Sequence, residues 1–271
     1  MSEIINLIDK NPDSHVYQKA AEILSKQLQD DFSFVLQVWS DATPKTKHKK
    51  ILILTSDETH KIPQQINDPD VAYIFKQYIP MSNYRDVNSV ENIPRIFALP
   101  LCELNGFTDF SKNIHDREYD WCWMGQYDPY RRTDFKNAIE IAKTLNGVKY
   151  KELWYNGWNN GAKIEDYCAI MNNTKIALVP TGSASFETFR FFEAMMCGCV
   201  VLSVPQPNVD FYNTAPFIPI NNWVNEISDT IRSVLNKKNL MSTISMSGRK
   251  WHNYYCSPEG LSNYMLEKIN A

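Results

Sequence analysis

The chain has 271 residues, of which 44% are hydrophobic and 13% aromatic, so it can bury the core of one large domain or of two small ones. Lys and Arg number 28 against 31 Asp and Glu, and the net charge of -3 lacks the basic excess typical of nucleic-acid binders and polybasic membrane anchors. This composition excludes a disordered or fibrous protein and favours a small, neutral or acidic ligand.

The beginning of the chain and its cysteines indicate a cellular compartment. The segment from Met1 to Ser14 contains three acidic residues and no basic segment followed by an apolar one, so we expect no signal peptide. The longest apolar runs, such as Cys199 to Val204, are far shorter than the roughly 20 residues of a membrane-spanning helix. The six cysteines form no Cys-x-x-Cys pair and have no histidines at zinc spacing. We therefore expect a cytoplasmic protein with reduced thiols in its core.

Helical and strand patterns alternate loosely in the first part of the chain. Apolar residues repeat at helical spacing from Ser14 to Leu28, after a Pro-Asp-Ser cap signal, which predicts an amphipathic helix. Short β-rich runs follow at residues 32–39, 51–55 and 71–78. From Asn92 to Phe110 the chain has irregular Pro, Asn and Gly residues and no clear period. We expect a boundary there between two lobes, residues 1–105 and 106–271.

The second lobe has a sharper pattern of strands and helices. Strands are predicted at residues 121–124, just before a turn at 157–161, at 176–180 and at 200–204. Helices are predicted at residues 132–145, 164–172, 186–197, 223–235 and, as one or more, within 241–269. Strands that alternate with helices predict a parallel sheet. The expected fold class is therefore α/β with two Rossmann-like lobes.

The stretch from Ile176 to Val204 carries the clearest functional signal. A buried strand is followed by a loop and then by a helix with charges at steps of three residues, and the residues concerned are Pro180, Thr181, Gly182, Ser183, Glu187, Arg190 and Glu193. A loop between a parallel strand and a helix offers backbone N–H groups and the positive end of the helix dipole to an anion. Arg190 can bind a diphosphate through two parallel hydrogen bonds, and Glu193 can accept hydrogen bonds from ribose hydroxyls.

Each of these interpretations has a simpler alternative. The charged residues on this helix can instead be a solvated face with ion pairs three residues apart. Arg131 and Arg132 open a helix where its dipole disfavours cations, so they are either phosphate ligands or an exposed pair. Tyr167 either stacks on a nucleobase or belongs to the core. The lysine cluster at residues 45–50 is most simply a solvated hairpin turn and only weakly suggests contact with DNA.

Several runs in the second lobe resemble a known family. The runs are Trp123-Met124-Gly125 followed by Arg131 and Arg132, Ala177 to Gly182, Arg190 with Glu193-Ala194, and Gly198 to Val201. Together they resemble the nucleotide-binding half of exostosin-like glycosyltransferases of the GT-B fold. The resemblance covers residues Tyr119 to Val204, while the first lobe matches only faintly through Ile51 to Glu58.

The resemblance implies an activity and its partners. It implies transfer of a sugar from a nucleotide-diphosphate sugar, bound by the C-terminal lobe, to a hydroxyl acceptor such as a glycan, bound mainly by the N-terminal lobe. It implies no metal and no cofactor apart from the donor substrate. The chain departs from retaining enzymes with two glutamates eight positions apart around this helix, because Ser185 stands eight residues before Glu193 and Glu187 is out of register. This departure favours an inverting enzyme.

Inverting transfer needs a base that takes the proton of the acceptor hydroxyl. We expect this base in the loop after the strand at 51–55, with Asp57 the first choice and Glu58 the second. His60 can serve instead or can position the carboxylate, and a capped loop without a catalytic role is the alternative. Two other functions stay open: a non-catalytic nucleotide-binding protein, and a glycosyltransferase that acts on modified bases in DNA.

Overall fold

The structure is a computed structural model of the chain, and it describes residues 3–8, 14–28, 31–56, 59–83, 85–104, 106–128, 132–155, 161–182 and 185–271. They form two compact units. Unit 1 comprises Met1–Asn105, Pro207–Asn213 and Asn253–Ala271, and unit 2 comprises Gly106–Gln206 and Thr214–His252. The units differ from the expected lobes, 1–105 and 106–271, because Pro207–Asn213 and the end of the chain, Asn253–Ala271, belong to unit 1.

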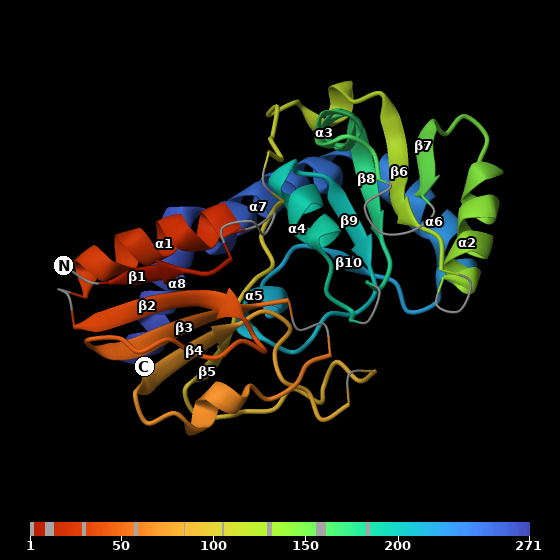
Figure 1. Cartoon of the computed structure of the whole chain (residues 1–271). Helices are drawn as coiled ribbons and strands as arrows, with labels where there is room; N and C mark the ends of the chain where they lie inside the picture. Colours follow the sequence, from red (N-terminus) through yellow and green to blue (C-terminus); the bar gives the residue numbers. More distant parts are fainter. Residues whose placement is uncertain are drawn as a thin grey trace. The chain divides into compact units, whose positions relative to one another are not determined.

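Unit 1 contains a five-stranded parallel sheet in the order β1-β2-β3-β4-β5 (Figure 1). Its strands are β1 (Ile4–Asn6), β2 (Phe32–Val38), β3 (Lys49–Thr55), β4 (Val71–Lys76) and β5 (Ile96–Ala98). Its helices are α1 (Ser14–Gln27), η1 (Gln64–Asn67), α5 (Asp210–Asn213) and α8 (Pro258–Asn270). The strands stand side by side in chain order, so among the described strands of unit 1 the direction of winding never reverses.

The helix predicted from Ser14 is confirmed as α1, which buries Tyr17, Ala20 and Leu24 and packs against α8 (Figure 1). The expected lysine-rich hairpin is wrong. Strands β2 and β3 pair in parallel, so the segment 39–48 returns the chain to the amino end of the sheet. All residues of β3 after Lys49 are buried, which is typical of a parallel strand covered on both faces.

Unit 2 contains the second five-stranded parallel sheet, in the order β10-β9-β8-β6-β7. Its strands are β6 (Tyr119–Gln126), β7 (Tyr150–Tyr155), β8 (Thr174–Val179), β9 (Val200–Ser203) and β10 (Ile218–Pro219). Its helices are η2 (Ile114–Asp116), α2 (Thr133–Lys143), α3 (Ile164–Asn172), α4 (Phe189–Met196) and α6 (Trp223–Asn236), and α7 (Lys238–Cys256) begins in this unit. The predicted alternation of strands and helices is confirmed.

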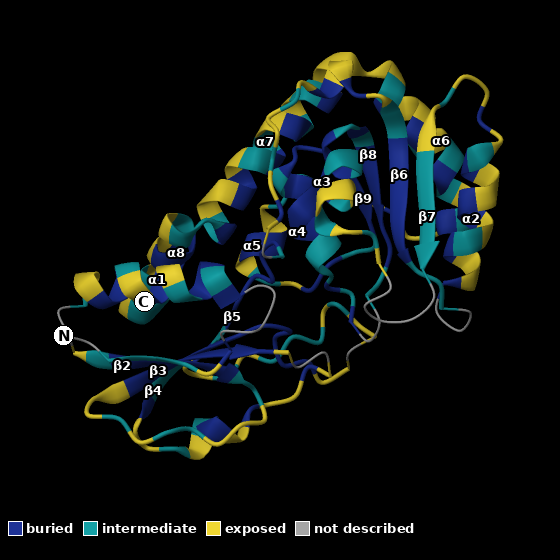
Figure 2. Cartoon of the chain, turned by 45° about the horizontal axis from the view of Figure 1, so that its top comes forward, coloured by how far each residue is buried: buried dark blue, intermediate teal, exposed yellow. Residues whose placement is uncertain are grey.

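The strand order of unit 2 reverses next to β6. The chain moves one way from β6 through α2 to β7, and then the other way through β8 and β9. Because such connections are right-handed, α2 must cover one face of the sheet and α3 and α4 the other (Figures 1 and 2). The carboxyl ends of β6 and β8 therefore form a topological switch point, where helices diverge to opposite faces and ligands bind in open α/β sheets.

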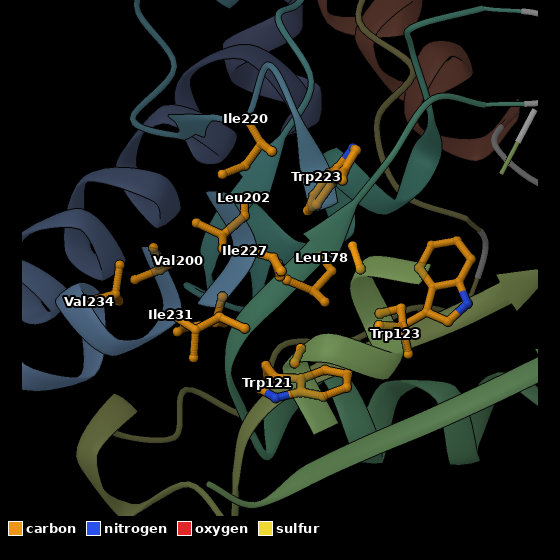
Figure 3. Close-up of a cluster of buried hydrophobic side chains, with 14 of the residues drawn as sticks. Trp121, Trp123, Leu178, Val200, Leu202, Ile220, Trp223, Ile227, Ile231 and Val234 are labelled. Carbon is orange, nitrogen blue, oxygen red and sulfur yellow. The ribbon is translucent and has the colours of Figure 1, made fainter. Parts of the chain in front are cut away.

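The core of unit 2 is an apolar cluster between the sheet and the helices α2 and α6. Trp121 and Trp123 lie two residues apart on β6 and are both fully buried on this side (Figure 3). Strands β8 and β9 add Leu178, Val200 and Leu202, and α6 adds Trp223, Ile227 and Ile231 (Figure 3).

The sequence also predicts thiols in the core and no membrane-spanning segment. All six cysteines are buried, as expected for thiols in a core, and no disulfide joins them in the described part of the chain. Within the described residues, none of the helices is long and apolar enough to cross a membrane.

Candidate functional site

Arg132 links the two strand ends at the switch point of unit 2. This residue directly precedes α2, and its guanidinium donates through Nη1 to the Gln126 carbonyl, at 2.6 Å, and through Nη2 to the Thr181 carbonyl, at 2.9 Å. Gln126 ends β6, and Thr181 follows β8. The expectation of an exposed arginine pair is wrong for Arg132, which is only 6% exposed. Arg131 lies outside the described residues.

The loop after β8 folds back on itself at a glycine. Pro180 is buried and Thr181 and Gly182 are half-buried. A Cβ atom on Gly182 would lie 2.6 Å from the Glu187 carbonyl oxygen and 3.1 Å from that of Ser185, so only glycine fits this close backbone approach. Ser183, the last residue predicted for this loop, lies outside the described residues.

Helix α4 begins later than predicted. Its first residue is Phe189 rather than Phe186, and the preceding Thr188 is extended, with φ −153° and ψ 141°. The side chain of Thr188 makes no capping hydrogen bond to a backbone N–H group of α4, all of whose residues the structure describes. The first turn of α4 therefore presents the positive end of the helix dipole at the carboxyl edge of the sheet.

The carboxylates near α4 are buried, so the interpretation of a solvated charged face is wrong for them. Glu187 is 3% exposed and lies before the helix, and Glu193 is 1% exposed. The Tyr167 hydroxyl, from α3, donates a hydrogen bond to Glu193 Oε2 at 2.7 Å. Burial, and then the nearby charge of Glu193, raise the pKa of Tyr167 well above its ordinary value, so this hydroxyl stays protonated.

Arg190 lies one helical turn before Glu193 and contacts a tryptophan of the sheet. Its Cζ atom is 4.4 Å from the centroid of the Trp123 ring. Its Nε atom is buried and has no hydrogen-bond partner among the described residues. The structure thus brings together Arg132, Tyr167, Arg190 and Glu193 around the end of β6. Sequence reasoning did not assign a role to Trp123, although the Trp-x-Gly spacing at a strand end was a usable signal.

In unit 1 the structure describes His60 among the residues expected to act as a base, while Asp57 and Glu58 lie outside the described residues. The His60 ring is 2% exposed, and its Nδ1 atom is 2.8 Å from the Ile79 carbonyl oxygen. A carbonyl only accepts hydrogen bonds, so Nδ1 carries the proton, and in the neutral ring Nε2 is the basic nitrogen. The Tyr78 ring packs edge-on against this imidazole, with the centroids 5.9 Å apart.

The backbone near His60 is unusual. Five described residues of unit 1 other than glycine have left-handed φ angles: Ser56 at 69°, His60 at 57°, Tyr78 at 53° and Cys102 at 56° follow β3, β4 or β5, and Arg95 at 70° directly precedes β5. Each such residue stores roughly 1 to 3 kcal/mol of strain, and this strain is concentrated in proteins at binding and catalytic sites. The carboxyl edge of the unit 1 sheet is therefore a second candidate site.

The family described as glycosyl transferase-like matches residues 131–255, just under half of the chain. This range includes Arg132, Tyr167, Arg190 and Glu193, whereas Trp123 and Gly125 precede it. No curated protein sequence matches the chain.

Solved structures resemble the fold. Alr3699/HepE of Anabaena in complex with UDP has a TM-score of 0.51 at 8% identity, covering 93% of this chain and 81% of that one. An alpha-glucosyltransferase in complex with UDP-glucose and DNA containing an abasic site has a TM-score of 0.53 at 9% identity, covering 94% and 84%. Sucrose-phosphate synthase of Thermosynechococcus elongatus has a TM-score of 0.51 at 10% identity, covering 97% of this chain and 79% of that one. The predicted α/β fold with two Rossmann-like units, the GT-B class, is thereby confirmed.

The linking role of Arg132 leads to a stability prediction. Arg132→Met should lower the free energy of unfolding by about 2 to 4 kcal/mol, because it removes two charge-assisted bonds to carbonyl groups. Urea unfolding followed by circular dichroism measures this change. The matched control is Arg232→Met on the exposed side of α6, which should change the free energy of unfolding by about 0.5 kcal/mol or less. Equal effects of the two substitutions would contradict the linking role.

Proposed function

We propose that this protein is a glycosyltransferase that moves a sugar from a UDP-sugar to a hydroxyl acceptor. The observation that carries the proposal is the pair of Arg190 and buried Glu193 on one helix, beside the switch point of a parallel sheet. The family match over residues 131–255 and similar folds solved with UDP or UDP-glucose support the choice of donor. Kinship with the exostosin-like enzymes is part of the proposal and rests on the sequence runs.

The donor diphosphate is proposed to lie at the N-terminal end of α4. There the Arg190 guanidinium offers paired N–H groups, and the loop that begins at Pro180 offers the backbone N–H groups of Thr181, Gly182 and Ser183. Arg132 adds positive charge close by, although its Nη atoms already bind two carbonyl oxygens, and Arg131 is its proposed helper. Charge on the departing diphosphate is thus stabilised by groups already in place.

Glu193 is proposed to accept hydrogen bonds from the ribose hydroxyls. A carboxylate can accept about four hydrogen bonds, so the bond from Tyr167 to Oε2 is compatible with this role. That bond also fixes the rotamer of the carboxylate. We therefore assign Tyr167 to the ribose side of the site, in place of the base-stacking role expected from the sequence.

The acceptor is proposed to be a glycan bound by unit 1, with inversion at the anomeric carbon. The strained backbone at His60 and Tyr78 supports a binding site at that sheet edge. Asp57 is the proposed base and Glu58 the second choice. His60 is proposed either to position that carboxylate or to serve as the base in its place.

The alternative of transfer to DNA bases is less well supported. One similar structure binds DNA. However, the lysine cluster at residues 45–50 leads into the amino end of β3, whereas ligands of parallel sheets bind at the carboxyl ends.

A binding and turnover assay tests the proposed function. UDP and UDP-glucose should raise the melting temperature more than other nucleoside diphosphates, because a ligand at 100 times its Kd adds about 2.7 kcal/mol of stability. UDP-glucose should then be hydrolysed slowly without an acceptor and faster with a glycan acceptor. Binding without any turnover would identify a non-catalytic nucleotide-binding protein. An absence of nucleotide binding would refute the proposal.

The donor-site assignment predicts which substitutions weaken nucleotide binding. Arg190→Ala should lose about 1.5 to 3 kcal/mol of UDP binding free energy, because it removes charge-assisted bonds to phosphate. Glu193→Gln should weaken UDP but not UDP lacking both ribose hydroxyls. Titration calorimetry measures both effects, with Arg232→Ala and Glu140→Gln on exposed helix surfaces as controls. Unchanged UDP affinity in both site variants would refute the assignment.

The proposed charge balance at the donor site predicts that turnover does not need divalent metal ions. Turnover should survive excess EDTA, because guanidinium groups, backbone N–H groups and the α4 dipole are proposed to balance the diphosphate charge. The measurement is the rate of UDP-glucose hydrolysis with EDTA and after Mg²⁺ or Mn²⁺ is added back. Loss in EDTA and recovery with either ion would show that a metal is required.

The proposed catalytic base can be tested by substitution. Asp57→Asn should bind UDP normally and lower turnover by about 10² to 10⁴-fold, the usual contribution of a general base. Glu58→Gln should have this effect instead if the second choice is right, and His60→Asn should lower turnover to a smaller extent as a positioning residue. Wild-type turnover in all three variants would place the base elsewhere.

A further inference from the structure

The Trp123 indole is held rigidly at the end of β6. It is fully buried and packs edge-on against Phe135 of α2, with the ring centroids 4.7 Å apart. The Trp154 ring, from β7, is tilted against the indole, with the two ring centroids 5.3 Å apart. Figure 3 shows the indole at the rim of the apolar cluster, on β6. Because these contacts leave it no room to turn, the ring is a fixed surface for whatever lies on it.

Two guanidinium groups contact this one indole. The Cζ atoms of Arg190 and Arg132 lie 4.4 Å and 5.3 Å from the ring centroid, both within the range of cation–π attraction. The direction of Arg132 is set by its bonds to the Gln126 and Thr181 carbonyls. Arg190 differs from Arg132 in that its buried Nε atom has no hydrogen-bond partner among the described residues, while its guanidinium lies over the indole.

Gly125 makes the space in which this stack forms. A Cβ atom at this position would lie 2.7 Å from Arg190 Nη2 and 2.7 Å from the Trp123 ring atoms Cζ2 and Cη2. Gly125 follows Trp123 by two residues on β6, so its missing side chain would point to the same face of the sheet. A larger residue would therefore displace the guanidinium or the ring.

We infer that Trp123 is a positioning residue that holds Arg190 in the conformation that binds the donor diphosphate, an inference that rests on the proposed function. A guanidinium stacked through its flat face keeps the N–H groups at its edge available for two parallel bonds to phosphate. Two cations near one ring also repel each other, and a diphosphate relieves this repulsion. Stacking before the ligand arrives reduces the side-chain entropy that binding would otherwise lose.

The test is a double-mutant cycle on UDP affinity, measured by titration calorimetry. Trp123→Leu should weaken UDP about tenfold, and Trp123→Phe, which keeps a smaller aromatic face, about threefold. In an Arg190→Ala background, both substitutions should change the affinity by less than about twofold, because the group that Trp123 positions is gone. Gly125→Ala should weaken UDP in the wild-type background and have a reduced effect without Arg190.

Trp121→Leu is the matched control. Trp121 lies on the same strand and the same face, is equally buried, and stacks on Tyr150 rather than on an arginine. It should lower the midpoint of urea unfolding about as much as Trp123→Leu while UDP affinity stays unchanged.

The possible outcomes separate the inference from the proposed function. If Trp123→Leu does not fold, the Phe and Gly125→Ala variants carry the same cycle. Equal loss of affinity with and without Arg190 would show that Trp123 acts only on the fold, which overturns the inference. Unchanged affinity in Arg190→Ala would instead refute the donor-site assignment itself.

Discussion

The reversal of strand order between β6 and β8 is the constraint on which the candidate donor site depends. Because the connections are right-handed, α2 lies on one face of the sheet and α3 and α4 lie on the other. No single helix therefore covers the carboxyl ends of both β6 and β8. Arg132 spans the resulting gap through two backbone carbonyls. The backbone thereby places the two strand ends beside helix N-terminal ends, and the side chains need only supply charge and hydrogen-bond acceptors.

Much of this fold could be predicted from local patterns. The periodicity of α1 and α3 and the continuous apolar runs of β3 and β8 reflect burial, and burial leaves a direct trace in the sequence. The short edge strands β1, β5 and β10 were missed, because three or fewer residues carry no measurable period. The supposed lysine hairpin was wrong because the strand pattern does not distinguish parallel from antiparallel pairing.

The site was predictable as a set of residues but not as a geometry. The strand, loop and helix around Arg190 and Glu193 follow from chain order, whereas the burial of Glu193 depends on Tyr167, which lies 26 residues earlier on another helix. Helical spacing also suggested that Glu187 continues the helix, but the extended Thr188 ends that pattern. Trp123 was assigned no role because its contact with Arg190 joins two elements that are distant in sequence.

The two units differ in how their candidate sites are built. In unit 2 the residues Trp123, Tyr167, Arg190 and Glu193 stand on a strand and two helices, whose positions are fixed by the core. In unit 1 the proposed base residues stand in the loop after β3, next to backbone held in the left-handed region. Groups on regular elements are positioned more accurately than groups on loops, and loops change more readily in length and sequence. The proposed donor is one defined nucleotide sugar, which suits a site on the regular elements of unit 2. The acceptor must be distinguished from many other hydroxyl compounds, which suits a site on the loops of unit 1.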